Sequence, residues 1–376
     1  MKPIRDLSHF FSRGLAAAWF LVVCVPLVVS IVVQNPADGL PLVGIIVWIV
    51  VLRVARRLSP AAHADALTRK GQYAQALDMA ERALAVEGDG AWMGSRRLVW
   101  LNRRTTALLA LGHYDDALAS AVEALLTNAD SETISNCALA LTRLNRYEEA
   151  TVAARLALAL TRERSLTAQT SLALAMLARG MPAEGEALAR AGLADAQSLM
   201  PLVRTEQYAT CLATLARAEH ALRREAAAER ALIELKKVAH KSPLLRAMYV
   251  LEEANAHSGT PEEANRALDT LDAARSMAPD YVNWYVLQPG TFAALRDDER
   301  FGASLAEAHR RYADMAKLAP SKEVVEKAIA MATRTGTPRP AAQASRDALM
   351  AQVFTLGGTF LLLLVWTWRF FLASGS

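Results

Sequence analysis

The sequence predicts an all-α protein, a solenoid of helical hairpins with a transmembrane hairpin before it and one transmembrane helix after it. Three observations predict this class. A stretch of fourteen residues recurs three times, and residues 58–320 carry apolar side chains at helical spacing. Uncharged runs lie near both ends. Hydrophobic residues make up 53% of the 376-residue chain, which is high for a soluble protein.

Two apolar runs near the N-terminus predict the transmembrane hairpin. Residues 14–33 carry no charge over 20 positions, the length that a helix needs to cross the hydrocarbon core. Residues 39–52 form a run of only 14, which reaches about 21 Å of the roughly 30 Å core. Snorkelling of Arg53 and local thinning would close that gap, and a re-entrant or interfacial segment is the alternative. A cleaved signal peptide is less favoured, because no small-residue cleavage site follows the first run.

The placement of Lys and Arg predicts the orientation. No basic residue lies between the first two runs, and residues 348–368 form a third uncharged run with a single arginine beyond it. Basic residues instead precede the first run, follow the second and precede the third: Lys2, Arg5, Arg13, Arg53, Arg56, Arg57, Arg334, Arg339 and Arg346. Because positive charge favours the cytoplasmic side, we expect a multi-pass protein of the bacterial inner membrane. Its helical region would be cytoplasmic and its C-terminus outside.

These observations give five segments. The stretch TRTGTPRPAAQ at 333–343 is typical of a flexible linker. The expected boundaries are 1–13 for a cytoplasmic tail, 14–57 for the transmembrane hairpin, 58–320 for the cytoplasmic solenoid, 321–347 for a linker, and 348–376 for the C-terminal transmembrane helix and short tail.

The recurring stretch has shared columns. It reads GQYAQALDMAERAL from residue 71, GHYDDALASAVEAL from 112 and NRYEEATVAARLAL from 145. Gly or Asn suits a left-handed turn after a helix, Tyr suits the corner between two helices, and alanines let a neighbouring helix approach closely. The repeat-defining residues are Gly71, Tyr73, Ala76 and Ala83; Gly112, Tyr114, Ala117 and Ala124; Asn145, Tyr147, Ala150 and Ala157. Each hairpin must stack on the next to bury its apolar stripe.

These columns resemble the second half of the roughly 34-residue motif of the tetratricopeptide repeat (TPR) family, in a membrane-anchored bacterial form. The resemblance covers roughly residues 58–315 and is clearest for the first three units. The fourth has Pro182 in place of Tyr, and Gly185 and Gly192 in place of Ala. A fifth unit follows near Arg223, a sixth carries Ala267, Leu271 and Ala274, and residues 292–311 resemble closing helices. The resemblance implies a TPR-like α-solenoid, with a plain helical bundle as the alternative.

The resemblance also implies a partner-binding groove lined by the first helix of each repeat. The implied positions are Asn102, Thr106, Ser135, Thr142, Thr167 and Thr170. Small polar side chains suit an extended or helical segment of another protein. Thr106, Glu132 and Ser171 stand where some members carry a carboxylate clamp, so we do not expect recognition of chaperone tails.

The sequence shows no familiar pattern for catalysis, a metal or a cofactor. The histidines form no metal-binding pair, the cysteines (Cys24, Cys137 and Cys211) are far apart, and no phosphate-binding loop appears. The stretch GASLA around Ser304 lacks the second glycine of a nucleophile elbow. We therefore expect no enzyme, metal or cofactor, and a membrane hydrolase with an unrecognised site is the remaining enzymatic alternative.

Charge bears on the expected partners. The net charge of +4 is modest and belongs largely to the membrane flanks, so it does not indicate nucleic acid. Two basic clusters fit an acidic partner or the anionic inner leaflet, or are solvated helix faces. They are Arg96, Arg97, Arg103 and Arg104, and Arg223, Arg224, Arg230, Lys236, Lys237 and Lys241.

The expected function is that of an inner-membrane scaffold or adaptor. Its array would bind protein partners, either peptide segments or subunits of a membrane complex, and would contact membrane lipid, with homo-oligomerisation left open. The alternative is an assembly or quality-control factor for cell-envelope or haem-related biosynthesis. Paired N-terminal spans before a repeat domain resemble an inner-membrane protein associated with haem biosynthesis, although the third span departs from that plan.

Overall fold

The computed structural model describes residues 60–86, 94–127, 130–161, 165–199, 205–257 and 261–334. The chain divides into two compact units, of which one comprises residues 67–347. Of the other unit, residues 1–66 with 348–376, only 60–66 are described.

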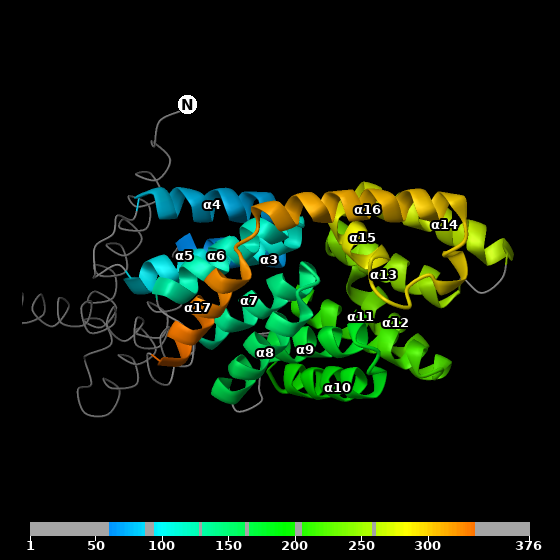
Figure 1. The fold of residues 1–376 in the computed structure, drawn as a ribbon, viewed down its shortest axis with the longest axis horizontal. Helices are drawn as coiled ribbons and strands as arrows, with labels where there is room; N and C mark the ends of the chain where they lie inside the picture. Colours follow the sequence, from blue (N-terminus) through cyan, green and yellow to red (C-terminus); the bar gives the residue numbers. More distant parts are fainter. Residues whose placement is uncertain are drawn as a thin grey trace, which may run out of the picture. The chain divides into compact units, whose positions relative to one another are not determined.

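The described residues form fifteen α-helices and one short 3₁₀ helix, η2, joined by short connections (Figure 1). Their bounds are α3 Pro60–Arg69, α4 Tyr73–Val86, α5 Gly94–Leu111, α6 Tyr114–Thr127, α7 Ser131–Arg143, α8 Tyr147–Thr161, α9 Leu166–Ala178, α10 Pro182–Leu199, α11 Thr205–Ala221, α12 Glu225–Ala239, α13 Pro243–Ala256, α14 Pro261–Met277, α15 Pro279–Val286, η2 Ala293–Leu295, α16 Glu299–Leu318 and α17 Lys322–Arg334.

The helices pack as consecutive antiparallel pairs, like a helical solenoid. The pairs are α5 with α6, α7 with α8, α9 with α10, α11 with α12, α13 with α14, and α15 with α16. Both helices of a pair also pack against the first helix of the following pair. The all-α class and the stacked pairs predicted from the sequence are therefore confirmed.

Left-handed turns join the two helices of a pair where the sequence predicts them. The φ angles are 73° at Gly71, 87° at Gly112 and 60° at Asn145. Gly180 and Arg223 take the same conformation in the next two pairs, with φ of 75° and 58°. An L-residue with a side chain is strained in this region, which explains why four of the five positions hold Gly or Asn.

The tyrosine and alanine columns form the contact between neighbouring helices. Tyr73 and Tyr114 are buried and Tyr147 is half-buried. The column alanines are buried except for Ala83, which is half-buried. The two glycines of the fourth unit stand where even a methyl group would be crowded. A Cβ at Gly185 would lie 3.1 Å from the carbonyl oxygen of Ala173, and one at Gly192 would lie 3.1 Å from Leu166 Cδ1.

The packed helices continue past residue 320, the predicted end of the solenoid. Residues Lys322–Arg334, at the start of the expected linker, form α17, which packs against α6. Its buried face consists of Val325, Ala328, Ile329 and Ala332. This i, i+3, i+4, i+7 spacing places the four side chains on one side of the helix.

No helix within the described ranges is long and apolar enough to cross a membrane. The predicted spans at 14–33, 39–52 and 348–368 lie outside the described residues, as do the tail 1–13 and linker residues 335–347.

Candidate functional site

The six predicted groove residues lie on the first helices of three successive pairs. Asn102 and Thr106 belong to α5, Ser135 and Thr142 to α7, and Thr167 and Thr170 to α9. All are buried except Thr106, which is half-buried. Four of their hydroxyl groups donate to the carbonyl oxygen four residues earlier, at 2.7–2.9 Å; these belong to Thr106, Ser135, Thr142 and Thr170.

Three of these residues form polar links from one pair to the next. The hydroxyl of Thr133 donates to Asn102 Oδ1 at 3.1 Å, which joins α7 to α5. The hydroxyls of Ser135 and Ser165 are 2.9 Å apart, which joins α7 to the N-cap of α9. Thr167 Oγ1 accepts from Gln207 Nε2 at 2.7 Å, which joins α9 to α11. A role for the six residues in binding a partner stays a prediction.

The chain's own α15 contacts α7, the middle one of these three first helices. Trp284 Nε1 donates to the carbonyl oxygen of Thr142 on α7, at 3.2 Å. Just after α15, Gln288 accepts from the Tyr147 hydroxyl at 2.7 Å and donates to Asn145 Oδ1 at 3.0 Å. Residues of α7, α8 and the turn between them thus contact a segment about 140 positions later in the chain.

Charged and aromatic side chains interleave where α15 meets α7, α11 and α13. We call Arg143, Arg217, Glu252, Trp284 and Tyr285 the inner cluster. The guanidinium of Arg143 lies 3.9 Å from the Trp284 ring centre, and that of Arg217 lies 4.5 Å from the Tyr285 ring centre. All five side chains are buried. Cations over aromatic faces are favourable, most of all when water is excluded.

A buried ion pair lies within the inner cluster. Arg217 Nη2 donates to Glu252 Oε1, and the Tyr285 hydroxyl donates to Glu252 Oε2 at 2.7 Å. Burial raises the pKa of Tyr285 well above its usual value and the Glu252 carboxylate raises it further, so the hydroxyl remains a donor. A buried charge is tolerated only when it is paired and hydrogen-bonded, so removing either partner would be costly.

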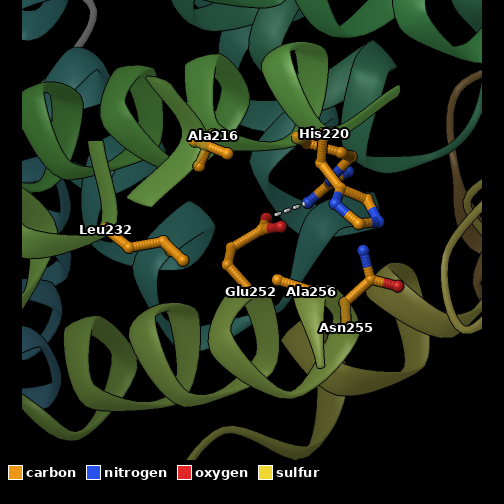
Figure 2. A pocket seen from close by; sticks show the side chains of 8 residues that line it. Ala216, His220, Leu232, Glu252, Asn255 and Ala256 are labelled. Carbon is orange, nitrogen blue, oxygen red and sulfur yellow. Dashed lines mark hydrogen bonds and ion pairs between the residues drawn. The ribbon is translucent and has the colours of Figure 1, made fainter. Parts of the chain in front are cut away.

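An enclosed cavity of about 10 Å³ adjoins this ion pair (Figure 2). Figure 2 shows the Glu252 side chain between His220 and Asn255 at one end and Ala216 and Leu232 at the other. This volume corresponds to about one water molecule. The cavity is therefore too small for an organic ligand, and the inner cluster connects four helices rather than enclosing a substrate.

A wider, open hollow lies between α15 and α16, which we call the α15–α16 depression. Its volume is about 440 Å³, and it is lined by Pro279, Asp280, Asn283, Glu307, Arg310, Arg311 and Asp314. Arg311 Nε donates to Asp280 at 2.9 Å, whereas Arg310 is exposed and has no ion-pair partner among the described residues.

Asn283 makes the α15–α16 depression chemically distinctive. The residue is 4% exposed, and its side-chain oxygen has no hydrogen-bond partner within the described part of the chain. An unsatisfied buried acceptor costs about 1–3 kcal/mol. A donor supplied by a bound group would remove that cost, and Arg310 would attract a carboxylate on the same group.

Neither the inner cluster nor the α15–α16 depression is predicted from the sequence. The available signal was the aromatic stretch PDYVNWYV at 279–286, which is unusually rich in large rings for this chain. Its contacts with Thr142, Arg143 and Arg217 are far away in sequence, so the pattern alone could not identify its neighbours.

Other candidate chemistry is limited in the described ranges. No group of three or more His, Cys, Asp and Glu side chains there is placed to hold a metal ion. Burial raises the pKa of both Cys137 and Cys211 to about 12, so these thiols are protonated at neutral pH. Ser304 of the GASLA stretch is 7% exposed and lies on the packed face of α16.

A function for this chain has to be inferred from its fold and from these contacts. No protein-family model matches the chain, and no curated protein sequence matches it.

Proposed function

We propose that the protein is a scaffold or adaptor of the bacterial inner membrane. In this proposal a cytoplasmic array of TPR type binds protein partners and organises a membrane-associated complex. The supporting observation is the series of stacked antiparallel helix pairs, which offers an extended surface while its enclosed cavity holds about one water molecule. The left-handed turns and the Tyr and Ala columns support the comparison with TPR units.

The α15–α16 depression is the partner-binding surface that we propose. A protein segment offers backbone N–H groups, which would donate to the unpartnered oxygen of Asn283, and acidic side chains, which would pair with Arg310. Glu307 and Asp314 lie at the same surface and are about half and two-thirds exposed, respectively. They would disfavour a purely acidic segment, so the expected partner carries charges of both signs.

Native co-purification tests this proposal. The tagged full chain is cross-linked in intact cells, extracted in mild detergent and compared with Arg310→Glu. The matched control is Arg155→Glu, which reverses an exposed arginine on α8 that has no ion-pair partner among the described residues. We expect one stoichiometric partner with the wild type and the control, and at least about tenfold less with Arg310→Glu, because one lost charge-assisted contact costs about 1.5–3 kcal/mol.

Two results would contradict the proposal. One is recovery of the chain alone, and the other is a partner retained equally by both variants. Substitutions at Asn102 or Ser135 are less informative, since both side chains are buried and link neighbouring helices.

A further inference from the structure

We propose that two turns far apart in the sequence form one basic surface that binds the headgroups of anionic lipids. We call it the basic turn surface, and its residues are Arg69, Lys70, Lys237, His240, Lys241 and Arg246. This inference rests on the proposed membrane location, but it does not depend on any protein partner.

Gly71 places the two turns in contact. A Cβ added there would lie 2.7 Å from Ser242 Cβ and 3.1 Å from the carbonyl oxygen of Lys241. The hydroxyl oxygen of Tyr73, two residues later, lies 3.4 Å from Ser242 Oγ, within hydrogen-bonding distance and across 169 positions of sequence. The turn after α3 therefore packs directly on the turn between α12 and α13, and it brings Arg69 and Lys70 beside Lys241.

The five Lys and Arg cations of this surface face solvent and are largely unneutralised. All six side chains of the basic turn surface are exposed. Within the described part, Lys237 pairs with Glu234 at 2.5 Å, and no ion pair involves Arg69, Lys70, Lys241 or Arg246. The predicted basic cluster at residues 96–104 differs, because Arg97 pairs with Glu123 and Arg104 with Glu81, at 2.5 and 3.7 Å.

Two features favour a lipid surface over an acidic protein segment. Ile233 is 50% exposed and precedes Lys237 by one helical turn on α12, so an apolar side chain lies beside the cations. Arg69 also follows the predicted span at 39–52 by fewer than twenty residues, in a chain segment that carries Arg53, Arg56 and Arg57. Basic side chains next to a membrane span are attracted to anionic headgroups, with a gain of about fivefold in binding for each.

Lysine footprinting of the full chain tests the proposal. The chain is combined with nanodiscs of phosphatidylcholine, or of phosphatidylcholine with phosphatidylglycerol, and its lysines are acetylated briefly and quantified by mass spectrometry. Lys317 and Lys327 are exposed lysines on α16 and α17 and serve as internal controls. We expect acetylation of Lys70, Lys237 and Lys241 to slow at least about fivefold in the anionic discs only, and 0.5 M salt to abolish the effect.

Two matched triple variants distinguish binding by this surface from a general effect of positive charge. Arg69→Gln, Lys241→Gln and Arg246→Gln together should abolish the protection of Lys237. Arg155→Gln, Arg179→Gln and Arg266→Gln together remove three exposed cations elsewhere and should preserve it. Because every substituted residue is exposed, folding should survive in both variants, and circular dichroism checks this.

The outcomes are decisive and independent of partner binding. Equal slowing at Lys317 and Lys327, or no difference between the two kinds of disc, would overturn the proposal. Stronger protection by an added acidic peptide than by phosphatidylglycerol would assign the surface to a protein ligand instead. Loss of a partner in the Arg310→Glu experiment would leave the lysine pattern unchanged.

Discussion

At the residue scale, two positions require glycine both for their backbone conformation and for close packing. Gly71 and Gly112 both have positive φ, and each has a later part of the chain against its Cα. A Cβ at Gly112 would lie 2.5 Å from Cβ of Asp280, at the start of α15. Gly180 occupies the equivalent turn with φ of 75°, but a Cβ there would have nothing within 4 Å. A side chain at any of the three positions would be strained by the positive φ, but only at Gly71 and Gly112 would it also meet close neighbours.

We predict that Gly112→Ala destabilises the protein more than Gly180→Ala. The second change imposes only the left-handed strain of about 1 kcal/mol, whereas the first adds overlap with Asp280, for a total of about 3 kcal/mol. Denaturant unfolding followed by circular dichroism measures both. Equal losses in the free energy of unfolding would show that α15 does not press on this turn.

The two described cysteines give a second prediction at this scale. Cys137 and Cys211 are fully buried, and burial raises the pKa of each thiol to about 12. Since the thiolate is the reactive form, we expect neither residue to be alkylated by iodoacetamide at pH 8 in the folded chain. Both should react at once in denaturant. Mass spectrometry quantifies each cysteine separately, and alkylation of Cys137 without denaturant would contradict this packing.

At the scale of elements, α17 is attached through one apolar face. Val325 is fully buried against its neighbours, while the adjacent Val324 is 45% exposed. Arg146, just before α8, also donates to the carbonyl oxygen of Pro320, just before α17. The helix is thus attached at its start and along one face.

We predict that Val325→Ala loosens α17 and Val324→Ala does not. Removing two buried methyl groups costs about 1–2.5 kcal/mol, whereas the exposed valine loses little. Hydrogen exchange of residues 322–334 reports the difference, and it should accelerate roughly tenfold or more only for Val325→Ala. Equal exchange rates in the two variants would mean that α17 does not depend on this face.

What the sequence predicts correctly is local. The turn glycines, Asn145 and the tyrosine and alanine columns lie within single hairpins, so spacing alone places them. The positions of α15 and α17 depend on segments more than a hundred residues away, such as Thr142 for Trp284 and Arg146 for Pro320. The apolar spacing of α17 is visible in the sequence, but nothing in it identifies α6 as the partner. For the same reason the sequence does not identify Asn283, because its place in the depression depends on the packing of α15 against α16.

At the scale of the whole unit 67–347, early and late helix pairs contact each other directly. The Tyr73 hydroxyl donates to Glu206 at 2.8 Å, across 133 positions, and Tyr312 donates to the carbonyl oxygen of Arg143. In a simple repeat array each unit touches only its neighbours, and stability is nearly a sum of local terms. These contacts predict more cooperative unfolding than that picture gives.

We predict that Tyr73→Phe weakens distant parts of the unit together. The change leaves the half-buried Glu206 carboxylate without its tyrosine donor, at a cost of about 1–3 kcal/mol. Hydrogen exchange should rise both at 72–76 and at 205–212. Tyr249→Phe is the control, because among the described residues that hydroxyl binds only Glu253, four residues away on the same helix. A rise confined to 72–76 would show that the contact does not couple the two regions.

The meeting of Gly71 and Tyr73 with Ser242 also sets an order of events during synthesis. These partners are separated by 169 positions, which a ribosome covers in about 10–30 s. Throughout that interval the first turn has emerged while the surface that receives it does not yet exist. Helix pairs can form as they are made, but the growing chain must hold the inner faces of its early helices open to water. The nascent protein is therefore at its most exposed just before residue 242 appears, the stage at which a chaperone would have the most apolar surface to bind.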